Sequence, residues 1–273
     1  MKERRNWPLY AVLAAFALVA IVPFLWVLMC SLMNTVEIYS GNLIPPNWRF
    51  SNYTEAWRRA RLGLYFKNSL YITVLAPLLG IALDSLAGYA FAKLRIRRWN
   101  WLFFLFLLGI FVPGEANLLS TRLQVQAIGL QNNLNGVVLA MLGTGMAFGI
   151  FLMRNFFLDI PDSFGESAKM DGAGTFAIFW RVYLPLARSG LVALFIFKII
   201  GAWNEFNLSL FILTDSDKWT IPLAVTSFRS MPGASNYGYI FAAAMICVFP
   251  ILILYFIFQR SFMEGITAGG VKG

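Results

Sequence analysis

The chain has 273 residues, of which 59% are hydrophobic and 13% are charged. Soluble domains average roughly 45–50% apolar and about 25% charged residues, so the composition excludes an ordinary soluble domain and predicts an integral membrane protein. The absence of His excludes a His-based catalytic triad, and two Cys are too few for a disulfide framework. A net charge of +9 fits either nucleic-acid binding or membrane topology.

Six apolar runs of membrane-spanning length follow one another along the chain. The first is too long for the apolar region of a cleaved signal peptide, so we expect it to stay in the protein as a span. Long unbroken runs favour helices over a closed barrel. The sequence therefore predicts an all-α integral membrane protein with one transmembrane domain over 1–273. The expected spans are 9–33, 68–92, 101–119, 134–153, 186–213 and 239–258.

The positions of the basic residues distinguish between the two meanings of the positive charge. With six spans both termini lie on one side, and the segments on that side carry 13 of the 22 Lys and Arg residues, including the basic turn at 93–98. The opposite segments carry 8, four of them in the cluster at 58–67. This bias predicts cytoplasmic termini and indicates topology rather than nucleic-acid binding.

The segment 154–185 is the longest stretch without a spanning run on the side of the membrane that holds the termini. Ser163 followed by Glu166 forms the pattern of a capping box, which predicts a short helix from Phe164 to Asp171. Gly172 is expected as the left-handed residue that ends this helix. A second helix over about 175–183 is expected to stop at Pro185. A short surface helix between two spans suits either the docking of a soluble partner or a plain connection.

The spacing within this loop resembles the signature of permease subunits in binding-protein-dependent ABC importers. That signature is Glu-Ala-Ala, three residues, Gly, nine residues, and then Ile-x-Leu-Pro. Glu166-Ser167-Ala168, Gly172 and Val182-Tyr183-Leu184-Pro185 match every spacing, with Ser and Val in place of one Ala and the Ile.

Other segments resemble the shorter permease of maltose-type sugar importers, and the resemblance covers almost the whole chain. The four segments are 66–70 (FKNSL), 87–92 (AGYAFA), 202–206 (AWNEF) and the Gly-rich end at 266–273.

The resemblance implies a non-catalytic transport subunit of a bacterial inner membrane that pairs with a second permease. Its other partners would be two ATP-binding subunits, which hold the ATP and Mg, and an external sugar-binding protein. This chain would bind no cofactor or metal of its own. The short loop helix would be the cytoplasmic coupling helix, seated in a cleft of the ATPase. The implied coupling residues are Phe164, Glu166, Ser167, Ala168, Met170, Asp171, Gly172, Leu184 and Pro185.

Polar residues inside the apolar runs are candidates for the transport path, because ionisable groups are costly in lipid. Asp84 shares a helix face with Gly80 and Gly88, which favours a structural contact. Glu115 follows a helix break, and broken helices line cavities in membrane proteins. Lys198 and Glu205 are two turns apart, too far for a direct pair. The path candidates are Glu115, Asn117, Trp203, Asn204, Glu205 and Phe206. Aromatic faces and amide groups, which suit a sugar, combine in Trp203, Asn204, Phe206 and Asn207.

Two other functions stay open at this level. An ion-coupled secondary transporter would use Asp84, Glu115 and Glu205 as ion or proton sites. A membrane scaffold without transport would leave the signature spacing unexplained. The chain has no G-x-x-x-x-G-K-[ST] loop, so ATP hydrolysis by a P-loop is not expected of it. The loop at 219–233 is a candidate contact for the external binding protein. The sequence does not name the sugar.

Overall fold

The computed structural model describes residues 7–94, 100–227 and 236–270. Within these ranges the chain is helical and contains no strand. Several features singled out in the sequence lie wholly or partly outside the described residues: the N-terminal Lys2, Arg4 and Arg5, most of the basic turn at 93–98, the outer part of the loop at 219–233, and the last residues of the Gly-rich end, 271–273.

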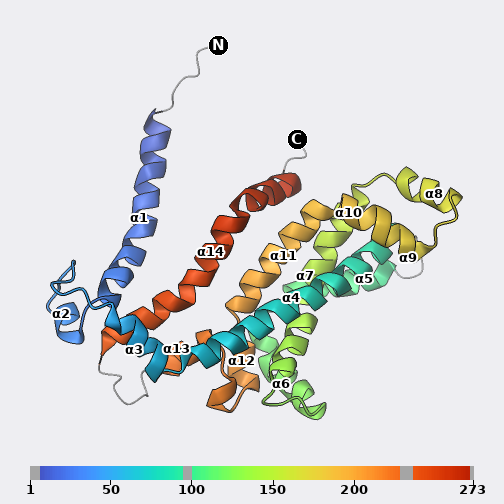
Figure 1. Ribbon diagram of the computed structural model, residues 1–273. Helices are drawn as coiled ribbons and strands as arrows, with labels where there is room; N and C mark the ends of the chain where they lie inside the picture. Colours follow the sequence, from blue (N-terminus) through green and yellow to red (C-terminus); the bar gives the residue numbers. More distant parts are fainter. Residues whose placement is uncertain (1–6, 95–99, 228–235, 271–273) are drawn as a thin grey trace. The chain divides into compact units, whose positions relative to one another are not determined.

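The helices follow the apolar runs of the sequence (Figure 1). Four of them are long and apolar enough to cross a membrane, and up to six spans result if two sharply bent helix pairs each count as one. The chain is therefore a multi-pass membrane protein, and six spans remains a prediction. The four long helices are α1 (Trp7–Ser31), α4 (Leu62–Lys93), α7 (Leu134–Leu158) and α14 (Tyr237–Gly270).

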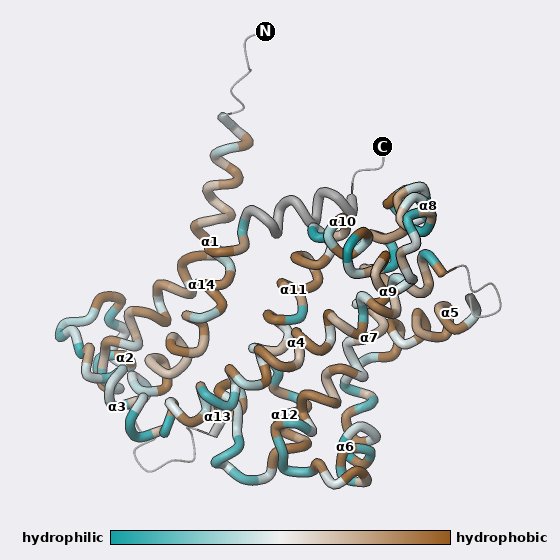
Figure 2. The backbone as a smooth tube through the Cα atoms, turned by 45° about the vertical axis from the view of Figure 1, so that its right-hand side comes forward, coloured by the Kyte–Doolittle hydropathy of each residue, from teal (hydrophilic) through white to brown (hydrophobic). Residues whose placement is uncertain are grey.

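The shorter helices connect or complete these spans. Apolar residues dominate α1, α4, α7, α11 and α14, whereas the connecting helices α3 and α8 carry more hydrophilic positions (Figure 2). The remaining elements are α2 (Thr35–Tyr39), α3 (Ser51–Arg59), α5 (Asn100–Leu108), η2 (Gly109–Phe111), η3 (Gly114–Asn117), α6 (Leu118–Ala127), α8 (Ser163–Met170), α9 (Thr175–Ile178), η4 (Phe179–Tyr183), α10 (Leu184–Leu186), α11 (Arg188–Trp203), α12 (Asn207–Ile212), η5 (Ser216–Lys218) and α13 (Ile221–Ser227).

Two sharp bends lie at the third and fifth predicted spans, one inside the third and one at the start of the fifth. The first lies at 112–113, where the helix ending at Phe111 and the one starting at Gly114 differ in direction by 99°. The break falls at the predicted Pro113-Gly114. The second lies at Ala187, where the direction changes by 80°. The fifth span also ends earlier than predicted, because α11 stops at Trp203 and a turn precedes α12.

The chain forms two compact units. One comprises 1–63 and 224–250, and the other comprises 64–223 and 251–273. In the first unit the side-chain amide of Asn52 donates to the carbonyl oxygens of Ser31 and Met33 at 2.8 and 2.9 Å. Asn34 and Glu37 form a capping box at the start of α2, and the backbone N–H of Asn34 holds the pKa of Glu37 below its usual value.

The second unit holds most of the buried core and the candidate sites. One apolar cluster joins α4, α6, α7 and α12, and a second, rich in aromatic rings, joins α4 and α7 to the segment after α8. The outer loop is tied to the start of α4. Asn68 donates to the carbonyl oxygens of Asp217 and Trp219 at 2.9 and 3.0 Å, and the Ser69 hydroxyl accepts from the Ile221 N–H at 2.8 Å.

A second connection at this end joins the loop after α6 to the loop after α12. Asn132 adopts a left-handed conformation with φ of 56°. Its side-chain oxygen accepts from the backbone N–H groups of Thr214 and Asp215 at 3.2 and 3.1 Å. Its amide nitrogen donates to the Asp215 carboxylate at 2.5 Å. Asn tolerates this backbone conformation better than most residues, so one side chain satisfies both requirements.

We expect Asn132→Ala to lower the free energy of unfolding by about 2 kcal/mol, because it removes three hydrogen bonds and strains a left-handed position. Asn132→Gly is the matched control, since it loses the same bonds without the strain and should cost less. Thermal unfolding of the purified protein in detergent measures both. Equal midpoints for the two variants would show that the conformation of Asn132 carries no strain.

Candidate coupling surface and membrane path

The predicted loop helix is present as α8, Ser163–Met170, within one residue of the expected bounds at each end. The capping box predicted for it is wrong. The residue before the helix is Asp162, which already has helical backbone angles and makes no side-chain cap. Ser163 lies inside the helix, where its backbone cannot take the extended conformation that a capping residue needs.

The C-terminus of α8 follows the prediction. Gly172 has φ of 82°, the left-handed conformation that Gly adopts at little cost. The Ala173 N–H donates to the Ala168 carbonyl at 3.0 Å, and the Gly172 N–H donates to the Lys169 carbonyl at 3.1 Å. This pair of bonds is a Schellman motif, which ends the helix sharply and returns the chain toward the membrane.

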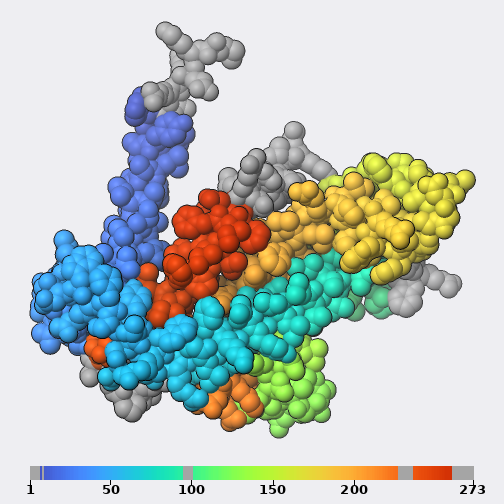
Figure 3. Space-filling model, viewed as in Figure 1, coloured from blue at the N-terminus to red at the C-terminus, as the bar shows by residue number. Residues whose placement is uncertain are grey.

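The two faces of α8 differ in what they contact. The inner face packs through Gly165 on the ring of Tyr183, and Ala168 packs on the aromatic cluster. The outer face presents Phe164 and Met170, which are 49% and 88% exposed. The other predicted coupling residues of this helix and turn, Glu166, Ser167, Asp171 and Gly172, are exposed as well. In Figure 3 the yellow segment around α8 forms the surface at one end of its unit.

The inner face rests on packed aromatic rings. Tyr89 lies 5.1–5.8 Å from the ring centroids of Phe157, Phe179 and Tyr183. Each such aromatic pair stabilises the fold by about 0.5–1.5 kcal/mol beyond the contribution of its buried apolar area. Because these rings come from α4, α7 and η4, the cluster connects α8 to two long apolar helices and to the turn η4.

Lys93, at the end of α4, adds a polar anchor. Its ammonium group lies 2.6 Å from both the Asp162 carboxylate and the Ile160 carbonyl oxygen, and 5.3 Å from the centre of the Tyr183 ring. The Lys93 side chain is only 6% exposed. Lys93 therefore connects the end of α4 to the residues directly before α8.

The segment after α8 differs from the prediction of a helix that stops at Pro185. It runs through α9, the π-helical turn η4 and α10 to Leu186, and it bends at Ala187 instead. Pro185 lies in the first turn of α10, where its missing N–H is not needed. Of the predicted coupling residues here, Leu184 packs on the aromatic cluster and Pro185 is exposed.

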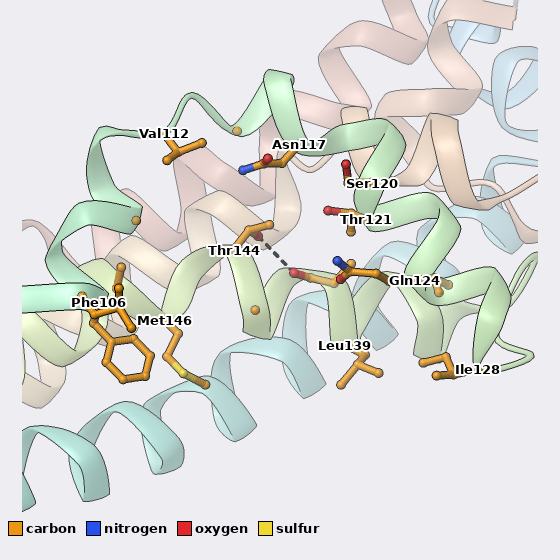
Figure 4. Close-up of a pocket in the computed structure, with 17 residues that line it drawn as sticks. Phe106, Val112, Asn117, Ser120, Thr121, Gln124, Ile128, Leu139, Thr144 and Met146 are labelled. Atoms are coloured by element: carbon orange, nitrogen blue, oxygen red, sulfur yellow. Dashed lines mark hydrogen bonds between the residues drawn. The ribbon is translucent and has the colours of Figure 1, made fainter. Parts of the chain in front are cut away.

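A groove of about 760 Å³ lies between the broken third span and α7 (Figure 4). Its polar side chains are neutral: Asn117, Ser120, Thr121, Gln124 and Thr144. Thr144 is held by a hydrogen bond from its hydroxyl to the Ala140 carbonyl at 3.1 Å. The rest of the lining is mostly apolar. Amides and hydroxyls beside apolar surface can bind a polyhydroxylated molecule through both its O–H groups and its C–H faces.

The predicted path residues do not meet at one place. Asn117 lines the groove, and Glu115 is exposed on the same short element, η3, without lining it. Trp203 is buried against Phe66, with ring centroids 5.5 Å apart. Ser120, Thr121 and Gln124 were missed because the sequence places them in a polar loop rather than on α6.

The residues after Trp203 form the turn between α11 and α12. The Asn204 amide donates to the Ile200 carbonyl at 3.0 Å. The Glu205 carboxylate accepts from the Leu208 N–H at 2.6 Å, so it acts as a helix cap. Phe206 is half-buried beside it. Residues 203–206 do not line the groove.

The sequence reading also missed an ion pair inside the membrane. The Lys198 ammonium on α11 lies 2.7 Å from the Asp84 carboxylate on α4, and their side chains are 13% and 1% exposed. Three glycines make room for this pair: a Cβ at Gly80 or Gly149 would clash with it, and one at Gly145 would touch it. The close packing predicted for Gly145 and Gly149 therefore has a specific cause. The contact could have been suggested from the sequence by considering charged residues of different spans as possible partners of one another.

Comparison with known proteins gives consistent matches over nearly the whole chain. Residues 3–267 match the family model described as the binding-protein-dependent transport system inner membrane component. The permease protein NgcG of a diacetylchitobiose uptake system in Streptomyces coelicolor is 34% identical, over 95% of this chain and 87% of that protein. The trehalose transport system permease protein SugB of Mycobacterium tuberculosis is 32% identical, over 93% of each chain.

A crystal structure gives the same result at the level of the fold. It is that of a bacterial ABC transporter involved in the import of the acidic polysaccharide alginate. One of its chains superposes with a TM-score of 0.82 at 26% identity, over 96% of this chain and 98% of that one.

Proposed function

This chain belongs to the family of inner membrane components of binding-protein-dependent transport systems, and we propose that it is one permease subunit of an ATP-driven importer of carbohydrates. Two of its relatives are named for the uptake of diacetylchitobiose and of trehalose. The chain works with a second permease, two ATP-binding subunits and an extracytoplasmic binding protein. Both of its termini lie in the cytoplasm of a bacterium.

The observation that carries this proposal is the construction of α8. An exposed face with Phe164 and Met170 is held on an aromatic cluster and on Lys93. Large exposed apolar side chains on an extramembrane helix mark a protein contact. A rigid helix with such a face transmits the closure of an ATPase to the membrane helices, since packed interfaces move as units. Glu166 and Asp171 add carboxylates that suit basic residues of the partner.

We expect the double variant Glu166→Lys/Met170→Asp to lose at least 90% of sugar uptake and to release the ATPase subunits. Glu166→Lys reverses the charge at an acidic position of the contact, and Met170→Asp replaces an apolar side chain of the contact with a carboxylate. Uptake into proteoliposomes and co-purification of the ATPase measure the two effects.

The control Glu55→Lys makes the same charge reversal on α3, where it also removes the ion pairs of Glu55 with Arg58 and Arg59. It should reach the membrane and retain the ATPase as the natural protein does. The assignment of α8 fails if the double variant still binds the ATPase and transports sugar at the natural rate.

The groove beside the broken third span is the part of the path that we assign to this chain. Asn117, Thr121 and Gln124 lie on its wall and contact the sugar hydroxyls during passage. The turn with Trp203, Asn204, Glu205 and Phe206 is the second candidate contact, at the end of α11. Neutral hydrogen-bonding groups suit a substrate that must bind weakly and leave again.

We expect Gln124→Leu to reduce sugar uptake about fivefold, the effect of one lost hydrogen bond of about 1 kcal/mol. ATP hydrolysis stimulated by the loaded binding protein should stay near the natural level, since α8 is untouched. Leu123→Ala, on the same helix but outside the groove lining, is the control. Uptake by Gln124→Leu equal to that of the control would remove the groove from the path.

The ion-coupled alternative loses its sites in this structure. Asp84 is paired with Lys198, and Glu205 caps α12. Glu115 is exposed, and one carboxylate does not make a relay. The family is that of transport driven through a binding protein, so the alternative is set aside.

A further inference from the structure

A second groove, of about 440 Å³, lies apart from the proposed sugar path. Its walls come from α4, from the segment 176–184 that follows the coupling helix, and from α11, with Phe258 of α14 closing one side. The lining is apolar apart from Ser85. Phe176 and Trp180 are 68% and 61% exposed at its edge. An open apolar groove in a membrane protein is a better binding site for a lipid chain than for water.

Two arginines are close in sequence to residues that line this groove, although neither is part of the lining itself. Arg188 begins α11, and it lies one turn before Leu191 and Val192, which form part of the wall. Arg181 follows Trp180 on the adjoining turn. Both arginines are exposed, and neither forms an ion pair with any residue that the structure describes.

The charges determine which lipid fits. An acyl chain gains little by leaving the bilayer for an apolar groove, because both surroundings are hydrocarbon. Selectivity therefore comes from the headgroup, and the guanidinium groups of Arg181 and Arg188 match the geometry of a phosphate. Trp180 lines the exposed edge of the groove and directly precedes Arg181, and Trp is enriched at membrane interfaces. Basic pockets between membrane helices take anionic headgroups in this way.

We propose that this groove binds one anionic phospholipid, with an acyl chain along α4 and α11 and its phosphate at Arg181 and Arg188. The bound lipid spans the 80° bend at Ala187 and connects α10 and α11 to α4. It thereby supports the segment that joins the coupling helix to the fifth apolar run.

Native mass spectrometry of the intact transport complex, purified in mild detergent, tests this proposal. The complex is incubated with phosphatidylglycerol or with phosphatidylcholine of the same acyl chains. We expect a preference for the anionic lipid of about 30-fold, since each arginine near an anionic surface contributes about fivefold. Arg181→Gln/Arg188→Gln should reduce this preference to near one. The control Arg122→Gln, on α6, should keep it.

Photocrosslinking identifies the occupant of the groove in the same complex. A phosphatidylglycerol with a diazirine on its acyl chain should label peptides that contain 78–86 and 191–195. Val192→Trp, which fills the groove, should reduce this labelling at least fivefold and leave labelling elsewhere unchanged. Labelling that is the same with Val192→Trp would overturn the proposal. Equal retention of the two lipids by the natural complex would overturn it as well. So would the finding that the second permease covers these peptides and prevents their labelling.

Discussion

Replacing either member of the Asp84–Lys198 pair should destabilise the protein by about 3–5 kcal/mol and abolish transport. Each of Asp84→Asn and Lys198→Met leaves the opposite charge buried without its partner, and a buried unpaired charge is far more costly than a pair is favourable. The Asp84 side chain is 1% exposed, so water cannot replace the lost partner. Membrane abundance and thermal unfolding in detergent measure the loss.

The double variant Asp84→Leu/Lys198→Met separates the cost of an orphaned charge from the value of the pair. With both charges removed, we expect most of the lost stability to return, because apolar replacements of a buried pair are often close to neutral. Lys169→Met on the exposed face of α8 is the control, and it should stay within about 0.5 kcal/mol of the natural protein. Single variants as stable as this control would mean that Asp84 and Lys198 are not paired in the membrane.

Features that depend on neighbours in sequence were predictable. The apolar runs predicted the long helices, because a membrane-spanning helix is recognised from one continuous run of apolar residues. The end of α8 was predictable for the same reason, since Gly172 follows the helix directly. The start of α8 was not, because the Ser163–Glu166 pattern says nothing about the backbone angles of the preceding Asp162, which are already helical.

Features that depend on contacts between distant segments were not predictable. The Asp84–Lys198 pair joins two helices, and the sequence shows only that each is charged within an apolar run. The sequence predicts a polar loop over 120–133, yet residues 118–127 form a helix whose Val125 is buried in a core cluster. Its polar face then becomes the wall of a groove. The turn after Trp203 depends on the contact of Glu205 with the Leu208 N–H.

Segments that resemble the sugar-importer permeases have physical roles in this structure. Asn68 and Ser69 hold the outer loop. Gly88 allows α4 to approach α7 closely, since a Cβ there would lie 2.8 Å from the Cβ of Met153. Tyr89, the next residue, enters the aromatic cluster under α8. These roles are structural, and they concentrate at the two ends of α4.

Gly165→Ala should uncouple the transporter, because α8 rests on Tyr183 at this position. An added Cβ would lie 2.5 Å from the Tyr183 hydroxyl oxygen and 3.0 Å from the ring, so the helix must shift or the ring must move. The ring is packed on two other aromatic rings, Tyr89 and Phe157, and cannot move without disturbing them. We expect sugar uptake to fall at least tenfold while the protein still reaches the membrane.

Tyr183→Phe in the same chain makes this prediction specific. It removes the hydroxyl, which is the nearest obstacle, and leaves the aromatic packing in place. The pair Gly165→Ala/Tyr183→Phe should therefore recover a large part of the uptake that Gly165→Ala loses. Gly174→Ala adds the same methyl group where no atom lies within 4 Å of it, and it should leave uptake within twofold of the natural rate. If Tyr183→Phe gives no recovery, the position of α8 is not set by its contact with Tyr183. If it restores uptake, the seat of the coupling helix lies at the contact between Gly165 and the end of η4.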